Sequence, residues 1–417
     1  MVKSIVSIAK EDDVEKLVTE VLAPFGGVKG LIKPGSTVVI KPNAGHVGGP
    51  ETSINTNPEL VAVLIKEIRK AKPKVIILAE ASAVGCDTME CLRVSGILKA
   101  AQEAGVDQVI DIKSETDLLN LPIRDARSDI TKVRLPRFLL EAEHIVNVPI
   151  FKSHCSIVFT LALKNIKVVV QVKVHYQMHQ TDLAKAMMDL WSMIKADINI
   201  ADLIRPAEGF GPHSTIPRDF GCLVAGKDPV AVDATVCRMV GLDIKQVAYF
   251  EPARERGLGN YDETLIEVRG KTIQEVFQPL WLPYLEGVEK YPEYDIDTEN
   301  ACSSCLSLVG LTMEKLKSLS EYDKNKDVHI FVGRKKAIPE GLDPYKVILF
   351  GDCLKKYRKK GVFVGGCPPA EPHPLWAIVD RKDQTDIDDV DFRPRMARED
   401  PFFKTHMQKL YKEHKEK

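Results

Sequence analysis

Apolar and polar positions alternate in regular blocks along most of this chain. Residues 36–42, "STVVIKP", form a β-branched run that ends in turn-forming residues. Residues 57–71, "NPELVAVLIKEIRKA", repeat apolar side chains at helical spacing, and we expect Asn57 to cap this helix ahead of Pro58. Residues 74–82, "KVIILAEAS", are again apolar up to a polar end. This order predicts a strand, a helix and a strand.

The same alternation continues to residue 241 and predicts the fold class. Strands that alternate with helices favour a parallel sheet, because the crossover helices must cover its faces. We therefore expect an α/β fold, with a mostly parallel sheet and helices on both faces. Further strands are expected at 106–112, 142–154 and 197–204, helices at 91–105 and 181–196, and a strand, loop and helix over 221–241.

The periodic pattern breaks near residues 285–300, where the sequence is polar and aperiodic. We therefore expect a first α/β domain with a polar cleft at 1–290, a smaller α/β domain at 291–380 and a charged tail at 381–417. The tail is expected to end in a solvated helix. Within the second domain we expect a helix at 308–320 and strands at 328–334, 346–352 and 361–366.

Composition narrows the class of protein. The apolar share of 44% suffices for a sizeable core, and the net charge is −1 with acids and bases interspersed. A nucleic-acid-binding surface would need clustered excess Lys and Arg, so nucleic acid is not an expected partner. No apolar run reaches the ~18 residues of a membrane span, and the apolar stretch at the N-terminus is too short for a signal peptide. We expect a cytoplasmic protein without a membrane span.

Four of the nine cysteines, Cys302, Cys305, Cys353 and Cys367, fall in the second domain. A reducing cytosol disfavours disulfides, so metal binding, catalysis or burial must explain these thiols. The C-x-x-C at 302–305 is expected in a loop before a helix, and the other two cysteines follow strands. A structural zinc site usually brings its ligands as two close pairs, whereas Cys-Pro after glycines is typical of iron–sulfur clusters. An iron–sulfur cluster is favoured over zinc, with isolated buried thiols third.

This cysteine pattern resembles that of nickel–iron hydrogenase small subunits. The shared features are a C-x-x-C, a later Cys after a strand and "GCPP" at 366–369. The cluster subunit of respiratory complex I next to the quinone site carries the same G-C-P-P. The resemblance implies one [4Fe–4S] cluster held by Cys302, Cys305, Cys353 and Cys367. The other five cysteines are expected to be small buried apolar side chains.

Polar residues interrupt the apolar pattern of the first domain in four places, at 41–58, 151–170, 174–182 and 225–234. The first is a Gly/Pro/Asn loop without the spacing of a nucleotide-binding loop. Lys and protonated His make charge-assisted hydrogen bonds to anions, and His transfers protons near neutrality. We therefore expect a small anionic substrate such as a carboxylate. The candidate catalytic residues are His154, Lys164 and His179, and the candidate substrate contacts are Lys41, Asn43, Lys152, Asn165, His175 and Asp228.

Simpler explanations exist for each of these residues. A single histidine is more often a satisfied polar side chain than a ligand. Lys164 could be a surface lysine, and Asp228 could cap the helix that begins at Pro229. Against this, three of the ten histidines and several lysines fall within 28 residues, at 152–179, beside apolar runs.

Most of residues 36–241 resembles the DUF362 family. The residues that carry the resemblance are "VVIKPNAG", "VPIFKSH" followed by "TLALKN", and "VAGKDPVAVDA". That family has no assigned reaction, and many of its members carry iron–sulfur motifs. The spacing of His154, Lys164 and His179 is also similar to that in lactate racemase, in which the lysine holds a nickel-pincer cofactor. This second resemblance implies such a cofactor as an alternative to chemistry coupled to the cluster.

These observations predict an iron–sulfur oxidoreductase that couples a [4Fe–4S] cluster to chemistry on a small anionic substrate. A redox partner protein is then expected to exchange electrons with the cluster. One alternative is a non-redox isomerase, racemase or lyase in which the cluster is structural. A third class is an electron-transfer protein without a reaction of its own.

Overall fold

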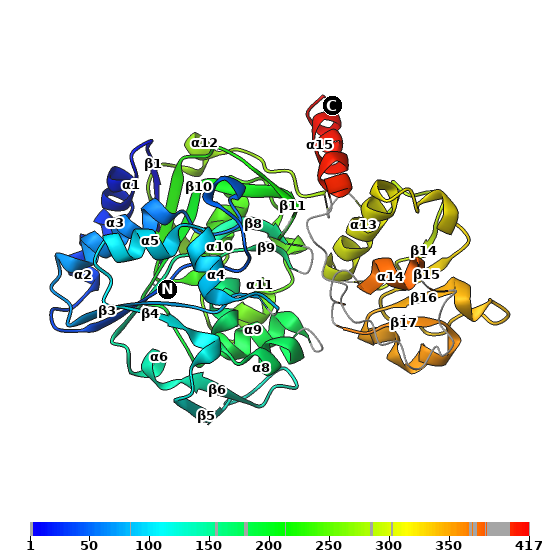
Figure 1. The fold of residues 1–417 in the computed structure, drawn as a ribbon, viewed down its shortest axis with the longest axis horizontal. Helices are drawn as coiled ribbons and strands as arrows, with labels where there is room; N and C mark the ends of the chain where they lie inside the picture. The colour runs from blue at the N-terminus through cyan, green and yellow to red at the C-terminus, as the bar shows by residue number, and fades with distance from the viewer. Residues whose placement is uncertain are drawn as a thin grey trace.

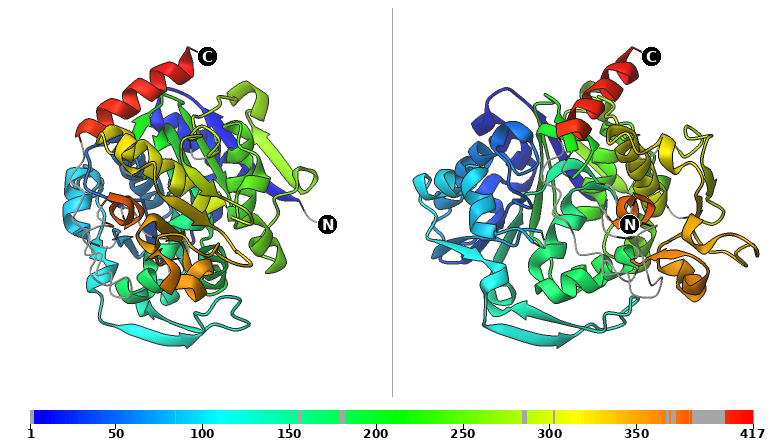
Figure 2. Two further views of the ribbon diagram at one scale, coloured as in Figure 1. Left: turned by 90° about the vertical axis from the view of Figure 1, so that its right-hand side faces the viewer. Right: turned by 45° about the vertical axis from the view of Figure 1, so that its right-hand side comes forward.

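The predicted α/β fold is confirmed, and the chain forms one large and one small sheet (Figures 1 and 2). In the larger sheet the strands follow the order β13-β1-β12-β10-β7-β2-β3-β4; β8 and β11 also pair with β10, and β9 pairs with β8. This computed structural model describes residues 3–83, 85–154, 157–178, 182–212, 214–283, 287–301, 303–366, 369, 373–379, 381 and 401–416.

The larger sheet is mostly parallel. Strands β10, β7, β2, β3 and β4 run parallel to one another, as do β13 and β1, whereas β12 runs antiparallel to both β1 and β10. The strands are β1 (Ser4–Lys10), β2 (Thr37–Lys41), β3 (Val75–Glu80), β4 (Gln108–Asp111), β7 (His144–Asn147), β8 (Ile150–His154), β9 (Val158–Thr160), β10 (Ile198–Phe210), β11 (Ser214–Pro217), β12 (Cys222–Gly226) and β13 (Ile266–Gly270); β5 (Leu118–Pro122) and β6 (Lys132–Pro136) form a separate hairpin.

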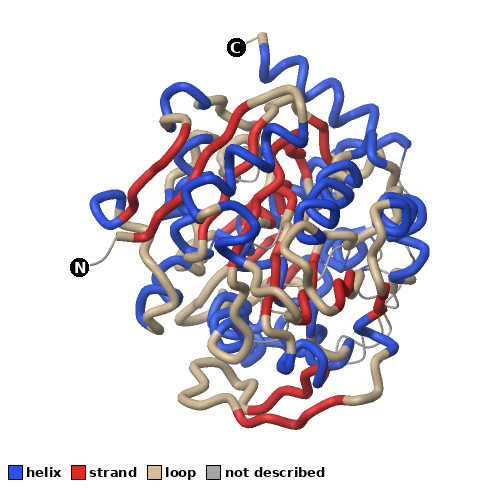
Figure 3. Tube along the Cα trace, turned by 90° about the vertical axis from the view of Figure 1, so that its left-hand side faces the viewer, coloured by secondary structure: helices blue, strands red, loops and turns tan. Residues whose placement is uncertain are grey.

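Helices cover both faces of this sheet because successive strand residues point to opposite sides. Val38 and Ile40 pack in one core with α1, α3 and α5, whereas Val39 packs in a second core with α9, α10 and α11. Figure 1 shows the first group in blue and cyan and the second in green, and Figure 3 shows the strands running between helices. The helices are α1 (Val14–Leu22), α2 (Gly27–Leu31), α3 (Pro58–Arg69), α4 (Thr88–Val94), α5 (Ile97–Glu103), α6 (Arg137–Glu141), α7 (Ala162–Asn165), α8 (Val172–Met178), α9 (Leu183–Trp191), α10 (Pro229–Met239), α11 (Phe250–Glu255) and α12 (Ile273–Val276).

Two expected elements of the first domain are each divided. The helix expected at 91–105 is α4 followed by α5, because Gly96 adopts a φ of 79°, which ends one helix before the next begins. The strand expected at 142–154 is β7 followed by β8. Pro149 separates them, since it has no N–H to donate to a ladder. The break between β7 and β8 matters most for the candidate site, because β8 carries Lys152 and His154.

The smaller sheet follows the order β14-β15-β16-β17, and all of its strand pairs are parallel. Its core also contains side chains of α13 and α14. Figure 1 shows this unit, in yellow and orange, beside the larger sheet. The elements are β14 (Asp295–Asp297), β15 (His329–Val332), β16 (Val347–Phe350), β17 (Val362–Val364), α13 (Ser303–Ser318) and α14 (His373–Val379).

The last helix, α15 (Pro401–Lys415), is packed rather than fully solvated as expected. Met407 is buried, and His406 Nε2 lies 2.8 Å from Glu314 Oε2 of α13. On the other side, the Tyr411 ring lies 5.8 Å from that of Trp281. The predicted tail therefore contributes a helix that joins the two domains, although residues 382–400 lie outside the described part of the chain.

Candidate functional site

Lys41 and Glu80 form a buried ion pair at the carboxyl ends of β2 and β3. Lys41 Nζ lies 2.6 Å from Glu80 Oε1, and both side chains are 1% exposed. Burial lowers the pKa of Lys41, and Glu80 opposes that effect. Glu80 Oε2 also accepts a hydrogen bond from the Ala44 N–H, at 2.8 Å. The pair therefore fixes the loop after β2, and its described bonds engage Lys41 with protein groups.

A chain of asparagine side chains continues from this loop across the sheet. Asn43 Nδ2 donates to Asn165 Oδ1 at 2.9 Å, and Asn165 Nδ2 donates to Asn147 Oδ1 at 2.8 Å. Asn147 in turn donates to Asn199 Oδ1, at 2.8 Å. The structure thus brings the predicted contacts Asn43 and Asn165 together, bonded to each other. The sequence analysis missed Asn147 and Asn199, although both interrupt apolar strands, in "HIVN" and "INIA".

Lys152 lies above this chain of amides. Its Nζ donates to Asn43 Oδ1 at 2.9 Å and to the Ile54 carbonyl at 2.5 Å, and both of these partners are neutral. The residue is 3% exposed. Burial lowers the pKa of Lys152 to about 7, and the charge of Lys164 adds to the effect. A Cβ on Gly45 would lie 3.8 Å from Nζ, so the loop backbone closely covers the amine.

Two more lysines follow within one short segment of chain. Lys164 lies in α7 and is half-buried. Lys167 lies in the next helical turn, three residues further on, and is 1% exposed. Burial, and then the charge of Lys164, hold the pKa of Lys167 well below its ordinary value. The charge of Lys164 thus acts on both Lys152 and Lys167, and these three residues are here called the lysine cluster. Lys167 was not among the residues predicted from the sequence, although its three-residue spacing from Lys164 could have indicated it.

Asp233 of α10 fixes the helix that carries Lys164. Its carboxylate accepts hydrogen bonds from the N–H of Ala162 at 2.9 Å and that of Leu163 at 3.2 Å, and from the Tyr249 hydroxyl at 3.1 Å. Burial raises the pKa of Asp233 to about 7. From α9, the Trp191 indole N–H donates to the Leu163 carbonyl at 2.6 Å. The first two residues of the short helix α7 are therefore held by α9 and α10, which positions the turn that carries Lys164.

The candidate histidines lie on two elements. His154 ends β8 two residues after Lys152, so both side chains leave the same face of that strand. His175 lies in α8, and both histidines are buried, at 7% and 8% exposed. His179 lies outside the described residues. Convergence of His154, Lys164 and His179 on one ligand, and the nickel-pincer cofactor that their spacing implies, stay predictions.

Asp228 follows β12 and caps the helix after it, which was the simpler explanation for this residue. Strand β12 runs antiparallel to β1 and β10, so its end meets the edge of the sheet where β1 begins. There Asp228 Oδ2 accepts a hydrogen bond from the Ser4 hydroxyl at 2.6 Å. Its Oδ1 caps α10 by accepting from the Val230 N–H at 2.9 Å. Asp228 is therefore in the capping position, two residues after Gly226, which shares a row of the sheet with Asn199, Asn147 and Lys41. Its role as a substrate contact stays a prediction.

The cysteine segments of the second domain meet at one end of the small sheet. Cys305 lies in the first turn of α13 rather than in a loop before it. Gly351 has a φ of 94°, and a Cβ there would lie 3.5 Å from Cys305 Sγ. The Asp352 N–H donates to the Gly366 carbonyl at 2.9 Å, and the Gly366 N–H donates back to Asp352 Oδ1 at 2.8 Å. The chain next to Cys353 is thus fastened to the chain next to residue 367.

Cys302 and Cys367 lie outside the described residues. Within the described part of the chain, no group of three or more His, Cys, Asp and Glu side chains could hold a metal ion. The missing side chain at Gly351 leaves Cys305 Sγ uncovered on that side, because a Cβ there would lie 3.5 Å from it. The four-cysteine ligand set stays a prediction.

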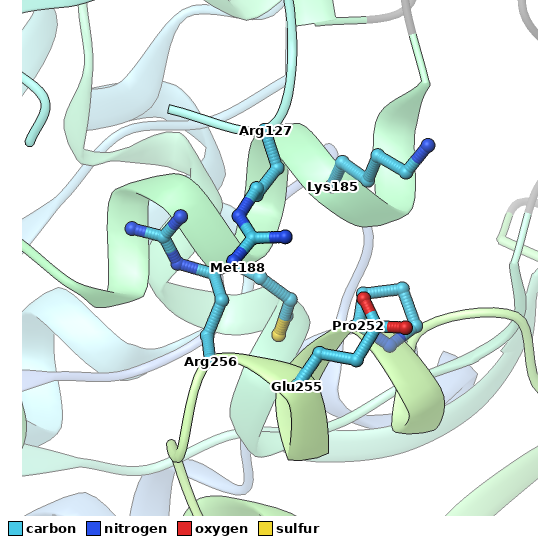
Figure 4. A pocket seen from close by; sticks show the side chains of 6 residues that line it. All are labelled: Arg127, Lys185, Met188, Pro252, Glu255 and Arg256. Atoms are coloured by element: carbon cyan, nitrogen blue, oxygen red, sulfur yellow. The ribbon is translucent and has the colours of Figure 1, made fainter. Parts of the chain in front are cut away.

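A separate pocket of about 310 Å³ lies away from these residues. Figure 4 shows the side chains that line it, with that of Lys185 extending away from that of Met188. Beneath it the buried Asp189 lies 2.9 Å from Arg256 Nη1 and accepts a hydrogen bond from the Ser128 N–H at 2.8 Å. None of the predicted site residues lines it. The lining residues are Arg127, Lys185, Met188, Pro252, Glu255 and Arg256.

Comparison with known proteins supports the predicted family for the first domain. Residues 38–238 match the sequence model of the family described as "Domain of unknown function (DUF362)". The thylakoid-associated protein sll1697 of Synechocystis sp. is 26% identical over 228 residues, which cover 53% of this chain and 68% of that protein. These matches support the DUF362 resemblance over 38–238, whereas the segment that carries Cys302, Cys305, Cys353 and Cys367 lies beyond the family match.

Two solved structures are similar at low sequence identity. A crystal structure of a Thermotoga maritima protein matches with a TM-score of 0.29 and 14% identity, over 53% of this chain and 57% of that one, which is less than two thirds of its length. The lactate racemase apoprotein of Thermoanaerobacterium thermosaccharolyticum matches with a TM-score of 0.42 and 12% identity, over 91% of this chain and 81% of that one. Among the helices that the structure describes, none is long and apolar enough to cross a membrane. The cytoplasmic location stays a prediction.

Proposed function

We propose that this protein is an iron–sulfur oxidoreductase that acts on a small organic anion. In this proposal the lysine cluster of the first domain binds the anion. Cys302, Cys305, Cys353 and Cys367 of the second domain bind one [4Fe–4S] cluster, and a redox partner protein exchanges electrons with it. When bound, such a cluster supplies one-electron transfer.

The observation that carries the proposal is the buried amine of Lys152. Its two described hydrogen-bond partners are neutral oxygens, and burial and the charge of Lys164 lower its pKa to about 7 although Glu80 opposes them. A buried cation is costly unless an opposite charge compensates it. A carboxylate placed against Lys152 and Lys164 would supply that charge. Asn43, which is itself bonded to Asn165, then holds the amine, and Asp233 holds α7.

The described residues that surround Cys305 support the second half of the proposal. Gly351 leaves room beside the sulfur, and the paired hydrogen bonds between Asp352 and Gly366 join the two strand ends that lead to Cys353 and residue 367. Cysteines on separate elements can bind one cluster only if the segments that carry them are held close together. Four thiolates at these positions match the number that a [4Fe–4S] cluster needs.

A second candidate is a non-redox isomerase or lyase with a structural cluster. The pKa of Lys152, near 7, favours it, because an amine that titrates near neutrality can both donate and accept a proton. The buried His154, on the same face of β8, would be the second acid–base group. An electron-transfer protein without its own reaction would have no use for a buried lysine cluster.

One experiment distinguishes the two candidate functions. Anaerobic, oxidised protein in D2O is mixed with a panel of 2-hydroxy and 2-oxo acids. An oxidoreductase is expected to show the electron paramagnetic resonance signal of a reduced cluster with at least one 2-hydroxy acid. Deuterium exchange at the carbon next to the carboxylate, with an unchanged cluster spectrum, would contradict the oxidoreductase and support the isomerase.

A further inference from the structure

A second group of reactive side chains lies at the carboxyl end of β3, separate from the four C-terminal cysteines. Cys86 lies in the loop between β3 and α4, and its Sγ is 3.7 Å from His46 Nδ1. Cys91 lies five residues further on, in α4, and is buried. The Ala83 N–H donates to the Gly45 carbonyl at 2.9 Å, which fastens this loop to the one that covers Lys152.

The surroundings make Cys86 the more reactive of the two thiols. A hydrogen bond from Cys91 lowers the pKa of Cys86 to about 7, and the charge of Lys113 acts in the same direction. Lys113 Nζ also donates to the Cys86 carbonyl. The same hydrogen bond raises the pKa of Cys91, so its thiol is less acidic than that of Cys86. Cys86 is half-exposed, so a small oxidant can reach the thiolate, which is the nucleophilic form.

The other described cysteines of this domain differ from Cys86. Cys222 and Cys237 are both fully buried, and burial raises the pKa of each thiol. Neither lies next to a second cysteine or a lysine in the sequence. They are matched controls because they belong to the same domain and meet the same solvent and oxidant. They lack the exposure and the partner thiol that Cys86 has.

We propose that Cys86 and Cys91 form a peroxide-sensitive thiol pair, in which Cys86 is oxidised first and Cys91 then closes a disulfide. The Cys86 thiolate attacks one oxygen of hydrogen peroxide, the O–O bond breaks, and the departing hydroxide takes a proton and leaves as water. The resulting sulfenic acid is attacked by the Cys91 sulfur, so that an S–S bond forms, the S–O bond breaks and a second water leaves. Two electrons pass from the sulfurs to the peroxide.

The local geometry suits this closure. Asp87 caps α4, so Cys86 stands just before the cap and Cys91 is the fourth residue of the helix, two positions whose side chains commonly pack together, and both pack in the same core. A disulfide requires the two sulfurs to approach to about 2.05 Å. The movement falls on Cys86, because it lies in a loop, whereas Cys91 is held inside a helix. Buried Cys91 is protected from direct oxidation, so it remains a thiol until Cys86 has reacted.

The experiment uses the full chain with Cys353→Ser, so that peroxide does not act on an intact cluster and the result does not depend on the proposed function. The protein is reduced, desalted, treated with hydrogen peroxide, alkylated and digested with trypsin. Both cysteines fall in one expected peptide, residues 75–93. We expect this peptide to lose the mass of two hydrogens. We also expect Cys86 to be alkylated at least about tenfold faster than Cys222 or Cys237 at pH 7.

Single variants separate the two roles. In Cys91→Ser, Cys86 is expected to stop at the sulfenic acid, which dimedone traps. In Cys86→Ser, Cys91 is expected to remain unmodified, and Cys237→Ser is expected to behave like the parent protein. The proposal is overturned if peptide 75–93 keeps both thiols free under peroxide, or if dimedone labels Cys91 in place of Cys86.

Discussion

Lys152→Met is expected to weaken the binding of small carboxylates by about 10- to 150-fold, because a hydrogen bond to a charged group contributes about 1.5–3 kcal/mol. Methionine keeps the length of the side chain and removes its charge, so the loss reports on the ammonium group. Isothermal titration calorimetry with lactate, pyruvate and oxalate measures the affinity. Lys66→Met is the matched control, because Lys66 is an exposed lysine on α3.

The same residue predicts how binding depends on pH. The pKa of Lys152 is about 7, so the fraction of charged amine falls as the pH rises above that value. Carboxylate affinity is expected to fall by up to tenfold per pH unit above about pH 7, and this dependence is expected to vanish in Lys152→Met. Equal affinities for the parent and the variant at pH 6 would contradict a role for Lys152 in binding.

Folding stability supplies an independent check on Lys152. Its pKa is about 7 in the folded protein and 10.5 ordinarily, so the unfolded chain binds more protons between these values. Stability should therefore rise with pH across this window, by at most about 1.4 kcal/mol per pH unit for one proton. Urea unfolding of the parent and of Lys152→Met, at pH 7 and pH 10, measures the difference.

Cys353→Ser is expected to lose the cluster, because serine replaces one of four thiolate ligands and the remaining three leave one iron without its sulfur ligand. Iron content and the visible spectrum of anaerobically purified protein measure the effect. Cys237→Ser is the matched control, because Cys237 is fully buried within α10 of the first domain. Equal iron content and identical spectra in the two variants would contradict the assignment of Cys353.

Local pattern was enough to predict much of the first domain. Asn57 caps α3 as expected, since its side chain accepts from the Glu59 and Leu60 N–H groups, and Pro58 takes the first helical position. The apolar run around Val38 and Val39 also predicted a strand buried on both sides. A helix cap and a strand depend on residues that are neighbours in the sequence, so the local pattern was enough to predict them.

Sequence patterns did not predict the features that depend on strand direction and on contacts between distant parts of the chain. Asp228 follows β12, which runs antiparallel to β10, and its side chain caps α10, while its role as a substrate contact stays a prediction. Lys41 and Asn165 do lie at the expected edge, yet they bond to other protein groups. The pairing of His46 with Cys86 joins loops 40 residues apart, and no local spacing indicates it.

Analysis of iron and acid-labile sulfide in protein purified without oxygen tests the iron–sulfur assignment most directly. Full-length protein is prepared anaerobically, and its iron, zinc and sulfide contents are measured against protein concentration. The proposal predicts about four irons and about four sulfides per chain, as expected for one [4Fe–4S] cluster. One zinc per chain with neither iron nor sulfide would contradict it.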